Sequence, residues 1–135
     1  MKLVIAAQDI HACEVGIFDR EKLTHQKNFE TAPDGHLAAI ESALREWGIA
    51  KTTLTGIAVV RGPGSFTASR SSVATANALA FALTLPIFPF SNPERRPFSE
   101  LADLITSAAA SPLPVLPEYD KAPHITPSKK NVLAA

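Results

Sequence analysis

Several features that define whole classes of protein are scarce or missing in this 135-residue sequence. It has one cysteine, Cys13, so no disulfide can form within the chain, and small disulfide-stapled folds are excluded. Its four histidines are scattered, and neither a CxxC nor an HxxxH pair occurs, which excludes the common zinc sites. We therefore expect no metal site, and we expect Cys13 to be a small buried residue rather than a nucleophile.

The chain also has no net charge and no long apolar run. Thirteen basic residues balance thirteen acidic ones, so a broad basic surface for nucleic acid is excluded. The apolar runs have only strand length, which excludes a membrane helix, and no signal or lipidation motif is recognisable. Because 46% of the residues are hydrophobic and only 19% are charged, we expect a cytoplasmic globular protein with part of its surface covered by a partner.

The first thirty residues have the pattern of three strands. Residues 2–7 are apolar on both faces, which is typical of a central strand, and residues 12–19 alternate between apolar and polar. Residues 21–29 are more polar, as in an edge strand. A short turn at 19–21 joins the last two strands, so we predict an antiparallel meander.

Two helices and a buried strand are predicted next. Asp34 is a candidate N-cap, apolar residues follow it at helical spacing, and Gly48 suits the position after the last turn. Residues 54–60 are short, β-branched and apolar, which indicates a buried strand. The second helix, over about 67–85, is rich in small residues and carries apolar residues on more than one side. It must be covered by the sheet and, in addition, by either the first helix or a partner.

The last part of the chain is richer in proline. Residues 86–90 suit a short edge strand limited by prolines, and 98–110 a third helix. Five of the 11 prolines follow residue 110. We therefore expect one domain over 1–110 and an extended proline-rich tail over 111–135, with 131–135 disordered.

The stretch Arg61-Gly62-Pro63-Gly64-Ser65-Phe66-Thr67 links the predicted buried strand to the second helix. Its glycines allow a sharp turn, its proline fixes one φ angle, and Ser65 or Thr67 can cap the helix. Two interpretations follow. A glycine turn at a helix N-terminus favours an anion such as phosphate. The alternative is a tight turn without a ligand, which is the more common case for a lone GxG.

The same stretch carries a resemblance to a known family. Residues 56–70, followed by Ala74-Thr75-Ala76 and Leu79-Ala80, closely resemble the signature of the TsaB (YeaZ) family, and residues 12–15 and 117–130 contain further similar segments. The resemblance and the element order imply an α/β fold: a single actin-like (ribonuclease H-like) lobe, in which helices pack on a mixed five-stranded sheet and an extended C-terminal tail follows.

The resemblance also implies a function. TsaB proteins are non-catalytic scaffold subunits in the synthesis of threonylcarbamoyladenosine beside the tRNA anticodon. They bind the catalytic subunit TsaD through the helices of their first lobe, and the ATPase TsaE joins that complex. For this chain we expect a TsaD-like partner, a TsaE-like ATPase within the complex, contact with tRNA only through it, and a homodimer when the chain is alone. The residues expected at the partner interface are Leu37, Ile40, Leu44, Trp47, Val73, Ala76, Ala80 and Leu83.

Two departures from the actin-like pattern argue against catalysis. Ala7 stands where the first strand would end in an acidic residue, with Gln8 next, and residues 97–117 leave no room for a second lobe. Because such ATPases hold a metal-bound nucleotide between two lobes, we expect no catalytic residue, metal or cofactor. The glycine turn would then act as a hinge that sets the angle of the second helix, with Arg70 holding its first turn.

An enzyme remains the alternative hypothesis. A small nucleotide-binding phosphotransferase would use residues 62–67 and a metal carboxylate from Asp9, Glu14 or Asp19. A peptidase ranks last, because the sequence offers neither a metal-binding histidine pair nor a nucleophile with its base.

Four arginines are candidate contacts for phosphate or for an acidic partner. Arg61 and Arg70 flank the glycine turn and are the better candidates, whereas Arg95 and Arg96 lie in a polar turn and are expected to be solvated charges.

Overall fold

The structure, a computed structural model, describes residues 1–119. Five strands form one sheet in the order β3-β2-β1-β4-β5. The first three are antiparallel neighbours, and β4 and β5 run parallel to β1, so the sheet is mixed as predicted. The strands are β1 (Lys2–Ala6), β2 (Ala12–Asp19), β3 (Lys22–Glu30), β4 (Gly56–Gly62) and β5 (Ile87–Ser91).

Three α-helices connect or follow the strands: α1 (His36–Trp47), α2 (Phe66–Leu83) and α3 (Ala102–Ser107). The prediction that Asp34 caps α1 is wrong, because a short 3₁₀ turn, Pro33–Gly35, takes in Asp34 and leaves Gly35 as the N-cap. Gly48 ends α1 with a φ of 67°, as predicted. The third helix is shorter than predicted, because Phe98–Glu100 form a separate 3₁₀ turn.

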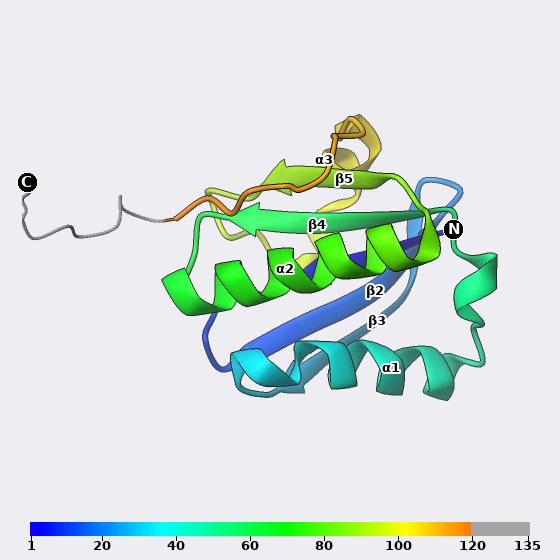
Figure 1. Ribbon diagram of the computed structural model, residues 1–135, viewed down its shortest axis with the longest axis horizontal. Coiled ribbons are helices and arrows are strands. Elements are labelled where there is room, and N and C mark those ends of the chain that lie inside the picture. Colours follow the sequence, from blue (N-terminus) through cyan, green and yellow to red (C-terminus); the bar gives the residue numbers. More distant parts are fainter. Residues whose placement is uncertain (120–135) are drawn as a thin grey trace, which may run out of the picture.

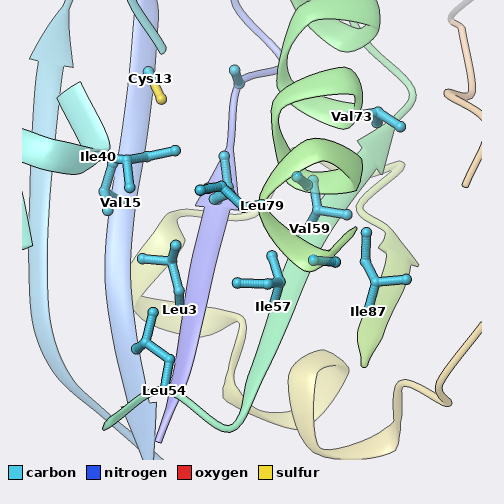
Figure 2. Packing of buried hydrophobic residues seen from close by; sticks show 14 of the residues in the cluster. Leu3, Cys13, Val15, Ile40, Leu54, Ile57, Val59, Val73, Leu79 and Ile87 are labelled. Carbon is cyan, nitrogen blue, oxygen red and sulfur yellow. The ribbon is translucent and has the colours of Figure 1, made fainter. Parts of the chain in front are cut away.

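Helices cover both faces of the sheet (Figure 1). On one face, α1 and α2 pack over Leu3, Val15 and Ile57, with Ile40 and Leu79 among their contributions (Figure 2). On the other face, α3 and the 3₁₀ turn before it pack over a separate cluster that includes Val4, Ala58, Phe90, Leu101 and Ile105. Successive residues of β1 serve opposite faces, as the pleat of a strand requires.

Cys13 and the residues after 110 were expected to be a buried thiol and an extended tail. Cys13 is completely buried, and burial raises the pKa of its thiol to about 12, which agrees with a packing role. The first part of the predicted tail packs on the lobe, since Val115 is only 5% exposed within the core of the α1 and α2 face. The expected disorder of 131–135 lies outside the described residues. No helix among residues 1–119 is long and apolar enough to cross a membrane.

Candidate functional site

The glycine turn lies where β4 ends and α2 begins. Ser65 is the N-cap of α2, and its Oγ accepts a hydrogen bond from the amide of Ala68 at 3.3 Å. The Ser65 amide donates to the carbonyl oxygen of Gln8 at 2.9 Å, which ties the turn to the end of β1. Of the two predicted capping residues, the structure uses Ser65, and Thr67 is exposed within the first turn.

Both glycines of the turn contact the chain itself. Gly62 has a φ of 133°, and a Cβ there would overlap the carbonyl oxygen of Glu118. A Cβ on Gly64 would lie 2.8 Å from both the Cα and the carbonyl oxygen of Gln8. The backbones of Gln8 and Glu118 therefore lie directly against the two glycines, and neither position has room for a side chain.

A network of neutral amides closes the same end of the sheet. Gln8 Nε2 donates to the carbonyl oxygens of Pro63, at 2.5 Å, and Asn92, at 2.9 Å. Asn92 Nδ2 donates in return to Gln8 Oε1 at 3.0 Å, and the Asn92 amide donates to the Gly62 carbonyl at 2.8 Å. Gln8 thus fixes the turn from the residue next to Ala7, just beyond the end of β1.

The acidic residues proposed for the enzyme hypothesis do not assemble at this turn. Asp19 lies at the far end of β2, 3.9 Å from the terminal amino group of Met1. Asp9 and Glu14 line a pocket of about 200 Å³ beside Gln8, and burial raises the pKa of Glu14. Within residues 1–119, no three histidine, cysteine or acidic side chains come together to hold a metal. The residues present therefore do not fit a metal-bound nucleotide at the glycine turn.

Three of the four arginines, Arg61, Arg70 and Arg96, differ in their surroundings. Arg61 is half-buried, and its Nε makes no hydrogen bond within the described part of the chain. Arg70 is exposed, with its guanidinium 5.3 Å from the centre of the Phe66 ring. Arg96, expected as a solvated charge, is half-buried and pairs with Asp103 at 2.6 Å. Arg70 alone of these three combines an exposed charge with a place beside the turn.

The residues predicted at the partner interface differ in how much surface they expose. Five of the eight residues have at most 3% of their surface exposed and belong to the chain's own core: Ile40, Leu44, Val73, Ala76 and Ala80. They face the sheet, because that is where α1 and α2 bury their apolar stripes. Leu37 is 49% exposed, and Trp47 and Leu83 are half-buried, so only these three retain surface for a partner.

The outward face of α2 carries residues that were not among the predicted interface residues. Phe81 is 79% exposed, and Ala74 and Ala78 are exposed along the same helix. The signal was present in the sequence: Leu79, Phe81 and Leu83 are spaced by two and cannot all face the sheet. Which of them turns outward depends on the helix rotation, and the tertiary packing fixes it.

Comparisons with known proteins match this chain to TsaB and TsaD proteins. The family described as "TsaD: tRNA N6-adenosine threonylcarbamoyltransferase" matches residues 34–95. A curated relative, the tRNA threonylcarbamoyladenosine biosynthesis protein TsaB of Haemophilus influenzae, is 36% identical over 85 residues, which are 60% of this chain and 35% of the relative. A tRNA N6-adenosine threonylcarbamoyltransferase of Geotalea uraniireducens is 35% identical over 85 residues, 62% of this chain and 23% of that protein.

The solved structures give the same answer for the fold. YeaZ from Pseudomonas aeruginosa superposes with a TM-score of 0.59 at 27% identity, over 67% of this chain and 44% of YeaZ. The fold is therefore the predicted ribonuclease H-like α/β lobe with a mixed five-stranded sheet. The chain matches only 35% of the length of its TsaB relative, so the match is to part of that protein.

Proposed function

Since this chain is a TsaB-like protein, we propose that it is a non-catalytic scaffold subunit in tRNA threonylcarbamoyladenosine biosynthesis and binds a TsaD-like catalytic subunit. The observation that carries the proposal is the outward face of its paired helices. On α2, Phe81 is 79% exposed, and the small residues Ala74 and Ala78 are exposed along the same helix; on α1, Leu37 is 49% exposed. Exposed apolar surface of this kind is typical of a protein that binds a partner.

The composition of this face suits a helical partner. Alanines allow another helix to approach closely, since the distance between packed helices depends on the side chains at the contact. An aromatic residue that projects from such a surface can act as an anchor in a pocket of the partner. An interface of ordinary size buries about 800 Å² on each side and needs about 20 residues, so loops beside α1 and α2 would contribute as well as the two helices.

A scaffold role is also supported by the closed glycine turn. The backbones of Glu118 and Gln8 lie against Gly62 and Gly64, so close packing accounts for both glycines without a phosphate. In the proposed complex, the chemistry belongs to the TsaD-like subunit, a TsaE-like ATPase joins that subunit, and tRNA reaches this chain only through the assembly. The phosphotransferase alternative receives no support from the turn.

The test is co-purification with the TsaD-like subunit of the same organism. Phe81→Glu should abolish co-elution, because a charge replaces the anchor, while the protein stays folded since Phe81 contributes little to the core. Ile10→Glu is the matched control, because Ile10 is 39% exposed at the turn between β1 and β2. If wild-type protein does not co-elute, or Phe81→Glu binds as well as Ile10→Glu, the proposal is wrong.

The same surface would also serve self-association. A chain without its partner leaves this face uncovered, and a homodimer buries it. Light scattering after size exclusion should then give a dimer for wild type and Ile10→Glu and a monomer for Phe81→Glu.

A further inference from the structure

Residues 111–119, here called the return segment, run back from α3 to the N-terminal end of α2 (Figure 1). The amide of Ser111 donates to the carbonyl oxygen of Ile87 at the start of β5, at 2.9 Å. Farther along, the amide of Glu118 donates to the carbonyl oxygen of Arg61 at the end of β4, at 2.7 Å. The segment therefore spans the lobe along its β5 and β4 edge.

Asn77 of α2 holds the middle of the return segment. Its Oδ1 accepts from the amide of Val115 at 2.9 Å, and its Nδ2 donates to the carbonyl oxygen of the same residue at 3.0 Å. A primary amide can satisfy a backbone N–H and C=O together, as a neighbouring strand would. Most of the residues around Asn77 in α2 are small or apolar, so this asparagine is explained by the segment it holds.

The glycine turn holds the other end of the return segment. Gly62 leaves room for the carbonyl oxygen of Glu118, as described above. The carboxylate of Glu118 accepts from Ser91 Oγ at 2.5 Å. The ring of Tyr119 stacks on Phe66 with a centroid distance of 4.5 Å and an angle of 29° between the planes.

We propose that the glycine turn and the adjoining side of α2 form a receptor for an extended peptide, and that its ligand is this chain's own segment Val115–Tyr119. The receptor recognises one buried aliphatic residue, followed after two residues by an acidic and an aromatic one. Three residues of the motif contact it: Gly62 admits the peptide backbone, Arg61 offers a carbonyl, and Phe66 stacks on the aromatic residue. This inference does not depend on the proposed partner, since the receptor is filled within one chain.

The contacts are few because the ligand is tethered. A segment joined to its site by a short stretch of chain has an effective concentration of about a millimolar, so contacts that would be weak between separate molecules suffice. The buried Val115 side chain, its hydrogen bonds with Asn77 and the Tyr119–Phe66 ring stack are weak contacts of this kind. A free peptide should therefore bind only when the tethered segment has been weakened.

Hydrogen exchange of the full chain tests whether the hydrogen bonds between Asn77 and Val115 hold the segment in place. In Asn77→Ala, the amides of Val115 and Glu118 should exchange at least tenfold faster than in wild type, while the amides of β1 and β4 keep their protection. Thr75→Ala is the matched control, a polar-to-alanine change two residues away on α2, and should behave as wild type. Unchanged exchange at Val115 and Glu118 in a folded Asn77→Ala protein would overturn the proposal.

A second experiment supplies the ligand from outside. The full chain carrying both Val115→Ser and Tyr119→Ser is titrated with a synthetic peptide of residues 111–119, and NMR shifts are followed at Arg61, Phe66 and Asn77. Saturable shifts at millimolar peptide, lost when Asn77→Ala is added, support the receptor. Absence of shifts overturns it, as do saturable shifts of the turn amides when Mg²⁺–ADP is added to wild-type protein.

Discussion

The side-chain amide of Gln8 makes two hydrogen bonds with Asn92: Asn92 Nδ2 donates to Gln8 Oε1 at 3.0 Å, and Gln8 Nε2 donates to the backbone carbonyl oxygen of Asn92 at 2.9 Å. Asn92 is 2% exposed, so the pair closes the interior at the point where β1 and β5 end. Ligands of open α/β sheets usually bind at the carboxyl ends of the parallel strands. Here neutral side chains of the protein occupy that place.

Replacing Gln8 tests how much this closure stabilises the fold. Gln8→Ala leaves the Pro63 carbonyl and part of the Asn92 amide without partners, so we expect a loss of about 2 kcal/mol in the free energy of unfolding. Gln26→Ala, at an exposed position of β3, should change it by less than about 0.5 kcal/mol. Urea unfolding of the three proteins measures both values, and equal stabilities would show that the amide pair is not needed.

Much of the fold could be predicted from local sequence, because the elements concerned depend on short-range rules. The alternation of residues 12–19 became β2, and Cys13, Val15 and Ile17 all face the same core cluster. Gly48 ends α1 because a left-handed residue is needed there, and Ser65 begins α2 because its hydroxyl can reach a free amide. Such preferences require no knowledge of distant residues.

The candidate site could not be predicted in the same way, because it depends on packing between distant segments. The small residues of α2 give no strong stripe, so its rotation is set by the sheet, which buries Ala76 and leaves Phe81 outside. Asn77 has no local partner, and its role appears only when Val115 arrives from a proline-rich stretch. The contact of Glu118 with the glycine turn was hidden for the same reason, since nothing near Gly62 in sequence indicates it.

The buried side chain of His36 should make the free energy of unfolding depend on pH. Its side chain is 1% exposed, both ring nitrogens lack a hydrogen bond within the described residues, and burial lowers its pKa from 6.5, opposed by the nearby Asp34. Below pH 6.5 the unfolded chain therefore takes up a proton that the folded chain resists, so folding free energy is lost as the pH falls, by up to about 1.4 kcal/mol per pH unit.

His36→Phe should remove this contribution, because an apolar ring of similar size has no proton to gain. Urea unfolding between pH 7.5 and 5.0 should give a smaller loss for the variant than for wild type, while His11→Gln, at an exposed histidine, should keep the wild-type slope. A wild-type slope in His36→Phe would mean that other groups govern acid sensitivity.

Two alanines of α2 separate loss of folding from loss of binding. Ala76 is fully buried under the helix, whereas Ala74 is exposed on its outer side. Ala76→Glu buries a carboxylate and should cost about 3 kcal/mol or more, whereas Ala74→Glu should cost less than about 0.5 kcal/mol. Thermal unfolding should put the two midpoints more than about 10 °C apart. If both variants melt alike, α2 does not bury Ala76 and expose Ala74; if they differ as expected, Ala74→Glu is the proper probe of partner binding.

Two glycines with positive φ distinguish backbone strain from occupied space. Gly48, at φ 67°, has no neighbouring atom within 4 Å of the place a Cβ would take, whereas at Gly62, φ 133°, the added carbon would overlap the Glu118 carbonyl oxygen. Gly48→Ala should therefore lower the free energy of unfolding only by the backbone strain, about 1 kcal/mol. Gly62→Ala should lower it by about 2–4 kcal/mol. Denaturant unfolding gives the costs, and proteolysis of residues 111–119 tells how the overlap is relieved. Faster cleavage there in Gly62→Ala alone means that the return segment leaves the turn; similar costs and cleavage in both variants would mean that Gly62 is required only for its backbone angle.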